Sequence, residues 1–185
     1  MRLAVSLVAM TLMVGSIVWR HPEYTLPRLL KRKIGGAGGP RELAKGILLG
    51  LAGTPVLFFL CSISATLAVS VTGVPIAEAE NAITAIWRIS PLLLLAVGIA
   101  AAIVEELIFR GILLDFARDR WGFPAALLVS SAVFALFHLS NAGFNATAAV
   151  HPFVAGLLLG LLCRSGGLRA SITAHAEVRF SSRMS

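Results

Sequence analysis

Long apolar runs are the feature that most constrains the fold of this chain. The run from Gly46 to Val71 carries no charged residue, and about 20 apolar residues are enough for a helix to cross the hydrocarbon core of a membrane. Apolar residues make up 57% of the chain and charged residues 14%, against about 25% charged in an average soluble domain. The other apolar runs are Leu3–Trp19, Pro91–Val104, Pro124–Leu139 and Phe153–Cys163, and a last run of residues that looks helical is Ala170–Phe180.

This pattern predicts an all-α fold, a polytopic membrane bundle of about six helical segments. The Gly46-x-x-x-Gly50 and Gly156-x-x-x-Gly160 spacings favour close packing between its helices. The last run, residues 170–180, is about half the length of a span, so we interpret it as a truncated segment. We expect residues 1–185 to form a single transmembrane domain, because the length suits one domain.

The basic residues indicate how such a bundle would be oriented. The net charge of +7 is by itself also typical of nucleic-acid-binding proteins, but seven basic residues fall in the single link 20–45. If that link is cytoplasmic, eleven Lys and Arg residues lie in inner links and only Arg88 lies in an outer one, as the positive-inside rule describes. We therefore expect a multi-pass protein of the plasma membrane with loop 20–45 cytoplasmic. Its expected partner is the lipid bilayer and not nucleic acid, and the sequence carries no signal for an oligomeric state.

Three charged residues, Glu105, Glu106 and Arg110, interrupt the apolar character of the third segment. Pro91–Val104 alone would make a helix of about 21 Å, shorter than the roughly 30 Å hydrocarbon core, so we expect the helix to continue to about Asp115. Glu106 and Arg110 are four residues apart, the spacing of a helical ion pair, and are most simply structural. Glu105 points about 100° away, and a carboxylate without such a partner in the membrane is a candidate general base.

Two histidines on other segments could converge on Glu105. His138 ends the fourth segment, four residues after Phe134, and His175 lies in the last segment. Either histidine alone is equally compatible with ordinary packing. A glutamate and two histidines together could activate a water molecule or hold a metal ion such as Zn²⁺, whose catalytic sites favour two His and one Glu. His151, beside an outer turn, is better interpreted as an interfacial residue.

Helix geometry alone places the three groups at different depths. At 1.5 Å per residue, Glu105, His138 and His175 would lie about 15, 21 and 8 Å from the inner surface. Their convergence therefore requires tilted or kinked helices, with Pro124 as a candidate for a kink.

Three motifs in order resemble those of the CAAX protease and bacteriocin-processing (CPBP, or Abi) family of intramembrane proteases. They are Glu105-Glu106-x-x-x-Arg110-Gly111, Phe134-x-x-x-His138 and a histidine in a late helix. The likeness covers residues 92–180, the second half of the chain. It implies hydrolysis of a peptide bond within the bilayer, in a prenylated or membrane-associated peptide or protein, by a carboxylate that activates water.

The roles that this resemblance implies follow the motif positions. Glu105 and His138 would activate the water, and His175 would polarise the scissile carbonyl or stabilise its oxyanion. Some members of the family look metal-dependent and others purely glutamate-dependent, so the same three residues are the candidate ligands of a Zn²⁺ ion. The supporting residues would be Glu106, Arg110 and Phe134.

The last motif departs from the family pattern. The fourth residue after the late histidine is Asn, or sometimes Asp, in the family and helps to hold the oxyanion, whereas this chain has Arg179 there. The change and the short tail fit a truncated or frame-shifted reading frame, or a member that has lost catalysis. The alternative function is therefore a non-catalytic membrane protein on the same fold, such as an immunity or scaffold protein.

Other function classes fit the sequence less well. The chain has no His-Glu-x-x-His zinc helix, no Gly-x-Gly-Asp dyad and no serine in a recognisable nucleophile motif. A small transporter would need a polar path across the bilayer, whereas the charges cluster near one depth and no inverted repeat is visible.

Overall fold

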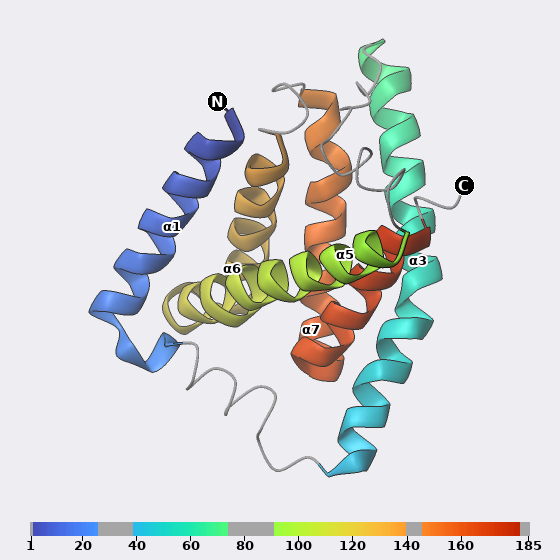
Figure 1. Ribbon diagram of the computed structural model, residues 1–185. Helices are drawn as coiled ribbons and strands as arrows, with labels where there is room; N and C mark the ends of the chain where they lie inside the picture. Colours follow the sequence, from blue (N-terminus) through green and yellow to red (C-terminus); the bar gives the residue numbers. More distant parts are fainter. Residues whose placement is uncertain (1, 26–38, 74–90, 140–145, 182–185) are drawn as a thin grey trace.

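A computed structural model describes residues 2–25, 39–73, 91–139 and 146–181, and every regular element in these ranges is helical (Figure 1). By length and composition, α3 and the Thr147–Val178 part of α7 could each cross a membrane. The all-α prediction is confirmed, while the number of crossings, about six, and their orientation stay predictions. The elements are α1 (Arg2–Arg20), the 3₁₀ helix η1 (Pro22–Tyr24), α3 (Pro40–Thr72), α5 (Pro91–Glu106), the π-helix η2 (Leu107–Leu113), α6 (Leu114–Leu139) and α7 (Ala146–Ser181).

Three of the expected links lie partly outside the described ranges. They are half of loop 20–45 (residues 26–38), nearly all of the outer link that holds Arg88, and most of the turn expected at residues 141–147. The basic end of the first loop is nevertheless described, and it differs from the expectation. α3 begins at Pro40 instead of Gly46, because proline is well tolerated in the first turn of a helix. Arg41 and Lys45 therefore belong to the first turns of α3.

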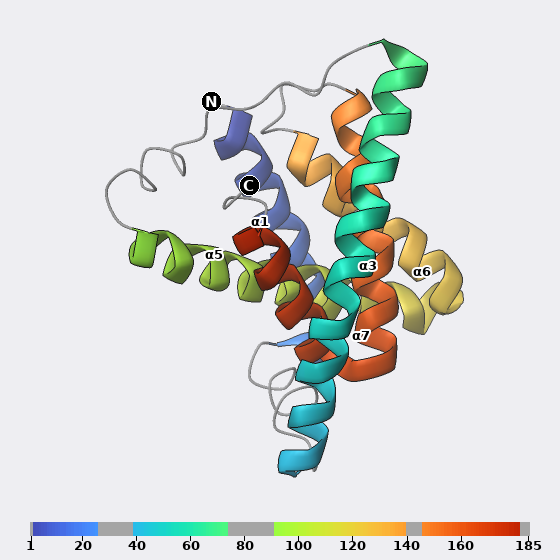
Figure 2. The same ribbon diagram turned by 90° about the vertical axis from the view of Figure 1, so that its right-hand side faces the viewer.

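Small residues let α3, α6 and α7 pack closely. α3 and α7 lie side by side in both views (Figures 1 and 2), and a Cβ added at Gly50 would lie 2.7 Å from the carbonyl oxygen of Ala170. A Cβ added at Gly156 in α7 would lie 2.9 Å from Cα of Ser131 in α6. No larger side chain fits at these distances, so both glycine spacings noted in the sequence lie at helix–helix contacts.

Two glycines redirect the chain inside α6 and α7. Gly122 has φ 76° and ψ 167°, and Gly167 has φ 74° and ψ −179°, in a backbone region that is essentially reserved for glycine. The kink considered at Pro124 therefore falls two residues earlier, and Pro124 lies in the first turn of the helix that follows. The second break starts a new helical direction just before the segment that carries His175.

α5 runs across α7 instead of alongside it (Figures 1 and 2). The π-helix η2 continues from its end, and the ring of Phe109 there is fully buried against Phe134 of α6. Ile17 of α1 and Tyr24 of η1 pack against the same cluster, so the N-terminal helix covers the outer side of η2 and α6. This crossing brings the end of α5, with its two glutamates, to the place where α6 and α7 meet.

Candidate active site

The residues predicted to converge do so around one oxygen of Glu105. Nε2 of His138, at the end of α6, lies 3.7 Å from Oε2 of Glu105. Nε2 of His175, in α7, lies 3.6 Å from the same oxygen. The tilt of α5 and the breaks at Gly122 and Gly167 thus remove the differences in depth expected from straight helices.

The cluster is sheltered but not sealed. The side chain of Glu105 is 12% exposed, that of His175 is 9% exposed and that of His138 is 26% exposed. His138 therefore forms the more open side of the cluster, and His175 forms the deeper side. Oε2 of Glu105 itself is buried, so water or a substrate reaches it only when the side chains around it move.

The hydrogen bonds of the two histidines fix which nitrogen faces Glu105 with a lone pair. Nδ1 of His138 lies 2.9 Å from the carbonyl oxygen of Phe134. Because a carbonyl oxygen can only accept, Nδ1 must carry the hydrogen, and neutral His138 presents Nε2 as an acceptor. Nδ1 of His175 lies 2.9 Å from Oε1 of Glu106, and an ionised carboxylate imposes the same arrangement on His175.

Three acceptor atoms therefore face one another when both histidines are neutral and Glu105 is ionised. Distances of 3.6 and 3.7 Å exceed those of direct hydrogen bonds and are of the size at which a bridging water should be considered. A water molecule has two hydrogens to donate to such a set. The alternative is a proton on one imidazole, which would turn that contact into an ion pair with Glu105.

Glu106 and Arg110 form the ion pair that their spacing predicts. Nη1 of Arg110 donates to Oε1 of Glu106 over 3.0 Å, and the two side chains are 1% and 0% exposed. Nη2 of Arg110 donates to the carbonyl oxygen of Gly156 in α7 over 3.1 Å. The pair therefore fixes α5 and η2 to α7 and also supplies the carboxylate that orients His175.

Phe134 joins the two parts of the site. Its ring centroid lies 4.5 Å from Cζ of Arg110, in the range of a cation–π contact. The same ring lies 4.3 Å from the ring of His138 and 5.9 Å from the ring of His175, between centroids. Phe134 thus contacts the buried guanidinium and both imidazole rings, and it limits the movement of the rings.

The helix that carries the glutamates continues past Asp115, as expected, but part of it is not an α-helix. α5 ends at Glu106, and residues 107–113 form a π-helix. Such short π segments are frequent at functional sites. Here the hydroxyl of Ser130 in α6 donates to the carbonyl oxygen of Phe109 over 2.9 Å, a contact between distant residues that hydrophobic periodicity does not reveal.

Sequence reasoning also missed three partners of the site. It did not foresee that His175 would bind Glu106, that the Gly156 carbonyl would accept from Arg110, or that Ser130 would bond to η2. Each contact joins segments far apart in the chain. The neighbouring Phe134 was recognisable because it lies one helical turn before His138.

Of two other residues singled out in the sequence, one lies apart from this cluster and the other has no described side chain. His151 is exposed in the second turn of α7, and its carbonyl oxygen accepts a weak hydrogen bond from Sγ of Cys61 over 3.9 Å. The side chain of Arg179, which stands where the family motif has Asn, lies outside the described residues. The effect of that departure therefore stays a prediction.

The chemistry of the cluster is compatible with a cation, because a carboxylate oxygen and two imidazole nitrogens are typical zinc ligands. Glu106 also accepts a hydrogen bond from Nδ1 of His175, as carboxylates behind many metal-bound histidines do. Within the described ranges, however, no group of three or more His, Cys, Asp and Glu side chains is arranged to hold a metal ion. The Zn²⁺ expectation stays a prediction.

Comparison with known proteins assigns the second half of the chain to a protein family. The family model for the Rce1-like type II CAAX prenyl endopeptidases matches residues 87–180, a range that contains both glutamates, Arg110, Phe134 and both histidines of the cluster. No curated protein and no solved structure matches the chain.

Proposed function

The chain belongs to the Rce1-like family of type II CAAX prenyl endopeptidases, and from this premise we propose that it hydrolyses a peptide bond within the membrane. The family is one of membrane proteases that act on proteins. The finer proposal is that the substrate is a prenylated or membrane-associated peptide and that Glu105 is the general base. The observation that carries it is the approach of two Nε2 atoms, from α6 and α7, to one oxygen of Glu105.

Glu105 and His138 hold and activate the water. One water hydrogen is donated to Oε2 of Glu105 and the other to Nε2 of His138, whose Nδ1–H is held by the Phe134 carbonyl. As the water oxygen attacks the scissile carbonyl carbon, Glu105 takes the proton.

His175 acts on the scissile carbonyl group of the substrate. Its Nδ1–H donates to Glu106, and this hydrogen bond holds Nε2 toward Glu105 and the reaction centre. A protonated His175 would donate through Nε2 to the oxyanion that forms on the scissile carbonyl. When the intermediate collapses, the C–N bond breaks and the leaving nitrogen takes the proton held by Glu105, so water is divided between the two products.

Metal dependence is a separate question. A Zn²⁺ ion held by Glu105, His138 and His175 would polarise the carbonyl and lower the pKa of a bound water. The buried pair of Glu106 and Arg110 would act in the same way with or without the ion, because it orients His175 from behind.

A cleavage assay with two histidine variants tests the proposal. The full chain is reconstituted in vesicles and given a prenylated CAAX-type peptide, and mass spectrometry follows the release of the C-terminal fragment. His138→Ala should lower the rate by about 10²–10⁴-fold, the usual contribution of an acid–base group. His151→Ala, at the histidine outside the cluster, should leave it unchanged.

The non-catalytic alternative predicts the opposite result. A folded wild-type chain that never cleaves the prenylated peptide, nor the same peptide without its prenyl group, would favour an immunity or scaffold role. Equal rates in wild type and His138→Ala would exclude His138 from the mechanism while leaving the protease assignment in place.

A further inference from the structure

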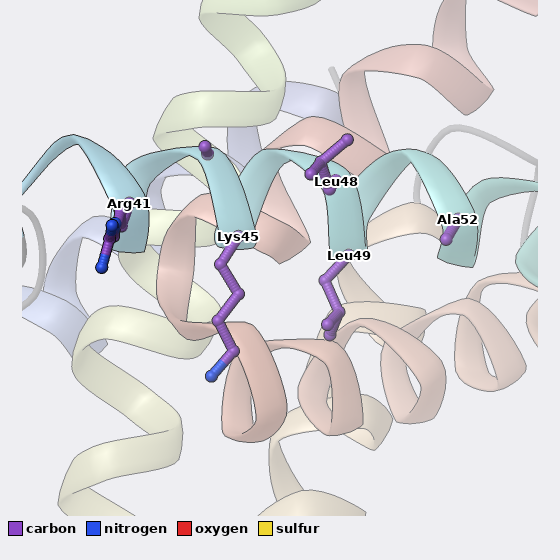
Figure 3. A pocket seen from close by; sticks show the side chains of 6 residues that line it. Arg41, Lys45, Leu48, Leu49 and Ala52 are labelled. Atoms are coloured by element: carbon purple, nitrogen blue, oxygen red, sulfur yellow. The ribbon is translucent and has the colours of Figure 1, made fainter.

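A groove of about 440 Å³ runs along one face of α3 (Figure 3), and none of its lining residues belongs to the glutamate–histidine cluster. Its lining residues are spaced three or four apart, which places them in one stripe along the helix. Two basic side chains lie at the start of the stripe and apolar side chains follow. The lining residues are Arg41, Ala44, Lys45, Leu48, Leu49 and Ala52.

The stripe runs from the charged start of α3 into its apolar part. From residue 41 to residue 45 the helix rises about 6 Å, and from residue 45 to residue 52 about 10 Å. Among the described helices, α3 is one of two that are long and apolar enough to span the roughly 30 Å hydrocarbon core. The apolar part of the groove therefore covers about two thirds of the hydrocarbon of one leaflet, with the charged end where α3 begins.

The charged end fits an anionic headgroup. Arg41 and Lys45 are both exposed and are four residues apart, so they project from neighbouring turns on one side of α3 (Figure 3). Arg169 of α7 lies beside the same turns, since a Cβ added at Gly46 would be 3.1 Å from its Cβ. Glu42, the acidic residue of this first turn, is not among the lining residues.

The apolar end fits an acyl chain. Leu48 is 64% exposed and Ala52 is also exposed, while Leu49 is half-buried and packs toward Gly166 of α7. The groove thus offers an apolar floor with a small residue, Ala52, at its far end.

We propose that this groove binds one anionic phospholipid of the leaflet in which α3 begins. The phosphate lies between Arg41 and Lys45, and one acyl chain lies along Leu48, Leu49 and Ala52. Clusters of basic residues next to a membrane span attract anionic lipids of the cytoplasmic leaflet. The bound lipid stabilises the packing of α3 on α7. The inference concerns the membrane-embedded surface and does not depend on proteolytic activity.

Lipid titration of the purified full chain tests the proposal. Phosphatidylglycerol or phosphatidylcholine with the same acyl chains is added in neutral detergent, and native mass spectrometry and the thermal unfolding midpoint report binding. Phosphatidylglycerol should bind more tightly and raise the midpoint more. The double variant Arg41→Gln/Lys45→Gln should bind it roughly thirtyfold more weakly, as expected for the loss of two interfacial charges.

Two further variants distinguish a specific lipid-binding site from general electrostatic attraction to a basic protein. Arg20→Gln/Arg164→Gln removes the same net charge elsewhere and should keep wild-type affinity. Ala52→Phe fills the apolar end without changing any charge and should weaken binding of phosphatidylglycerol. Each of three results would overturn the proposal. The first is equal affinity for both lipids, and the second is an equal loss of phosphatidylglycerol affinity in the two double variants. The third is a rise in the unfolding midpoint with inorganic phosphate alone that equals the rise with phosphatidylglycerol.

Discussion

At the scale of single residues, two adjacent carboxylates have different surroundings. Glu106 is fully buried and is held by Arg110 and by Nδ1 of His175. Glu105 is 12% exposed and faces the Nε2 atoms of His138 and His175. The ion pair could be predicted because its spacing is local. The bond between Glu106 and His175 could not, because it joins residues 69 positions apart and depends on how α7 packs.

The buried pair leads to a stability prediction. Arg110→Ala should lower the free energy of unfolding by about 3–5 kcal/mol, because it leaves the Glu106 carboxylate buried without its counter-charge. Denaturant unfolding of the full chain in detergent measures the change. Arg20→Ala, at an exposed arginine, should change it by less than about 0.5 kcal/mol.

Arg110→Lys sharpens that test. A lysine keeps the charge but lacks the planar fork through which Arg110 reaches both Glu106 and the Gly156 carbonyl. The variant should therefore have intermediate stability. An Arg110→Ala chain as stable as wild type would contradict the burial of the pair.

At the scale of helices, apolar runs predicted where the elements lie but not how they bend. The Pro124–Leu139 run coincides with the second part of α6. The π-helix at residues 107–113 was missed because the contacts with Ser130 and Gly156 that accompany it come from distant segments. The turn expected at residues 164–169 does contain the break at Gly167, since paired glycines are a local signal.

The break at Gly167 can be tested by adding one methyl group. Gly167→Ala should cost about 1–3 kcal/mol of folding free energy, because φ 74° with ψ −179° is strained for any residue with a Cβ. No atom lies within 4 Å of the added Cβ, so crowding would not explain the loss. The thermal unfolding midpoint and the cleavage rate should both fall. The cleavage rate is affected because the segment beyond the break carries His175.

Gly98→Ala is the matched control. Gly98 lies inside α5, and a Cβ added there also meets nothing within 4 Å. Because alanine favours a helix more than glycine does, this change should stabilise the chain by up to about 1 kcal/mol. If both substitutions had the same effect, backbone strain at Gly167 would be excluded.

At the scale of the whole molecule, polar contacts attach the N-terminal part to the helix that follows the site. The hydroxyl of Tyr24 donates to Oδ2 of Asp119 over 2.6 Å. Nη2 of Arg120 donates to Nε2 of His21 over 2.8 Å, and the Arg120 guanidinium lies 3.5 Å from the ring centroid of Phe116. The sequence could not predict this attachment, because neither hydrophobic periodicity nor the family motifs involve residues 21–24.

Tyr24 reports on that attachment through its ionisation. Burial, followed by the hydrogen bond to Asp119 and the negative charge of that residue, raises the pKa of Tyr24 to about 12, from about 10 in an unfolded chain. The contribution of the neutral Tyr24 hydroxyl to the free energy of unfolding is therefore complete below pH 10, and it is lost as the pH rises through 12. Tyr24 is the chain's single tyrosine, so tyrosinate absorbance follows it alone.

The titration of folded protein in detergent should have its midpoint near pH 12. Asp119→Asn removes the negative charge but keeps the burial, so its midpoint should lie between 10 and 12. A wild-type midpoint near 10 would mean that Tyr24 is not held against Asp119 in solution.

The central claim is that Glu105 takes the proton from the attacking water. The most direct test compares the rate of prenylated-peptide cleavage in Glu105→Gln and Glu177→Gln, reconstituted in the same vesicles. Glutamine keeps the shape of glutamate but cannot accept that proton. Glu177 lies in the same helix as His175, and its Oε2 accepts a hydrogen bond from Thr54 over 3.1 Å. Glu105→Gln should lose at least about 10²-fold in rate while folding normally, and Glu177→Gln should cleave like wild type. An undiminished rate in Glu105→Gln would contradict the account.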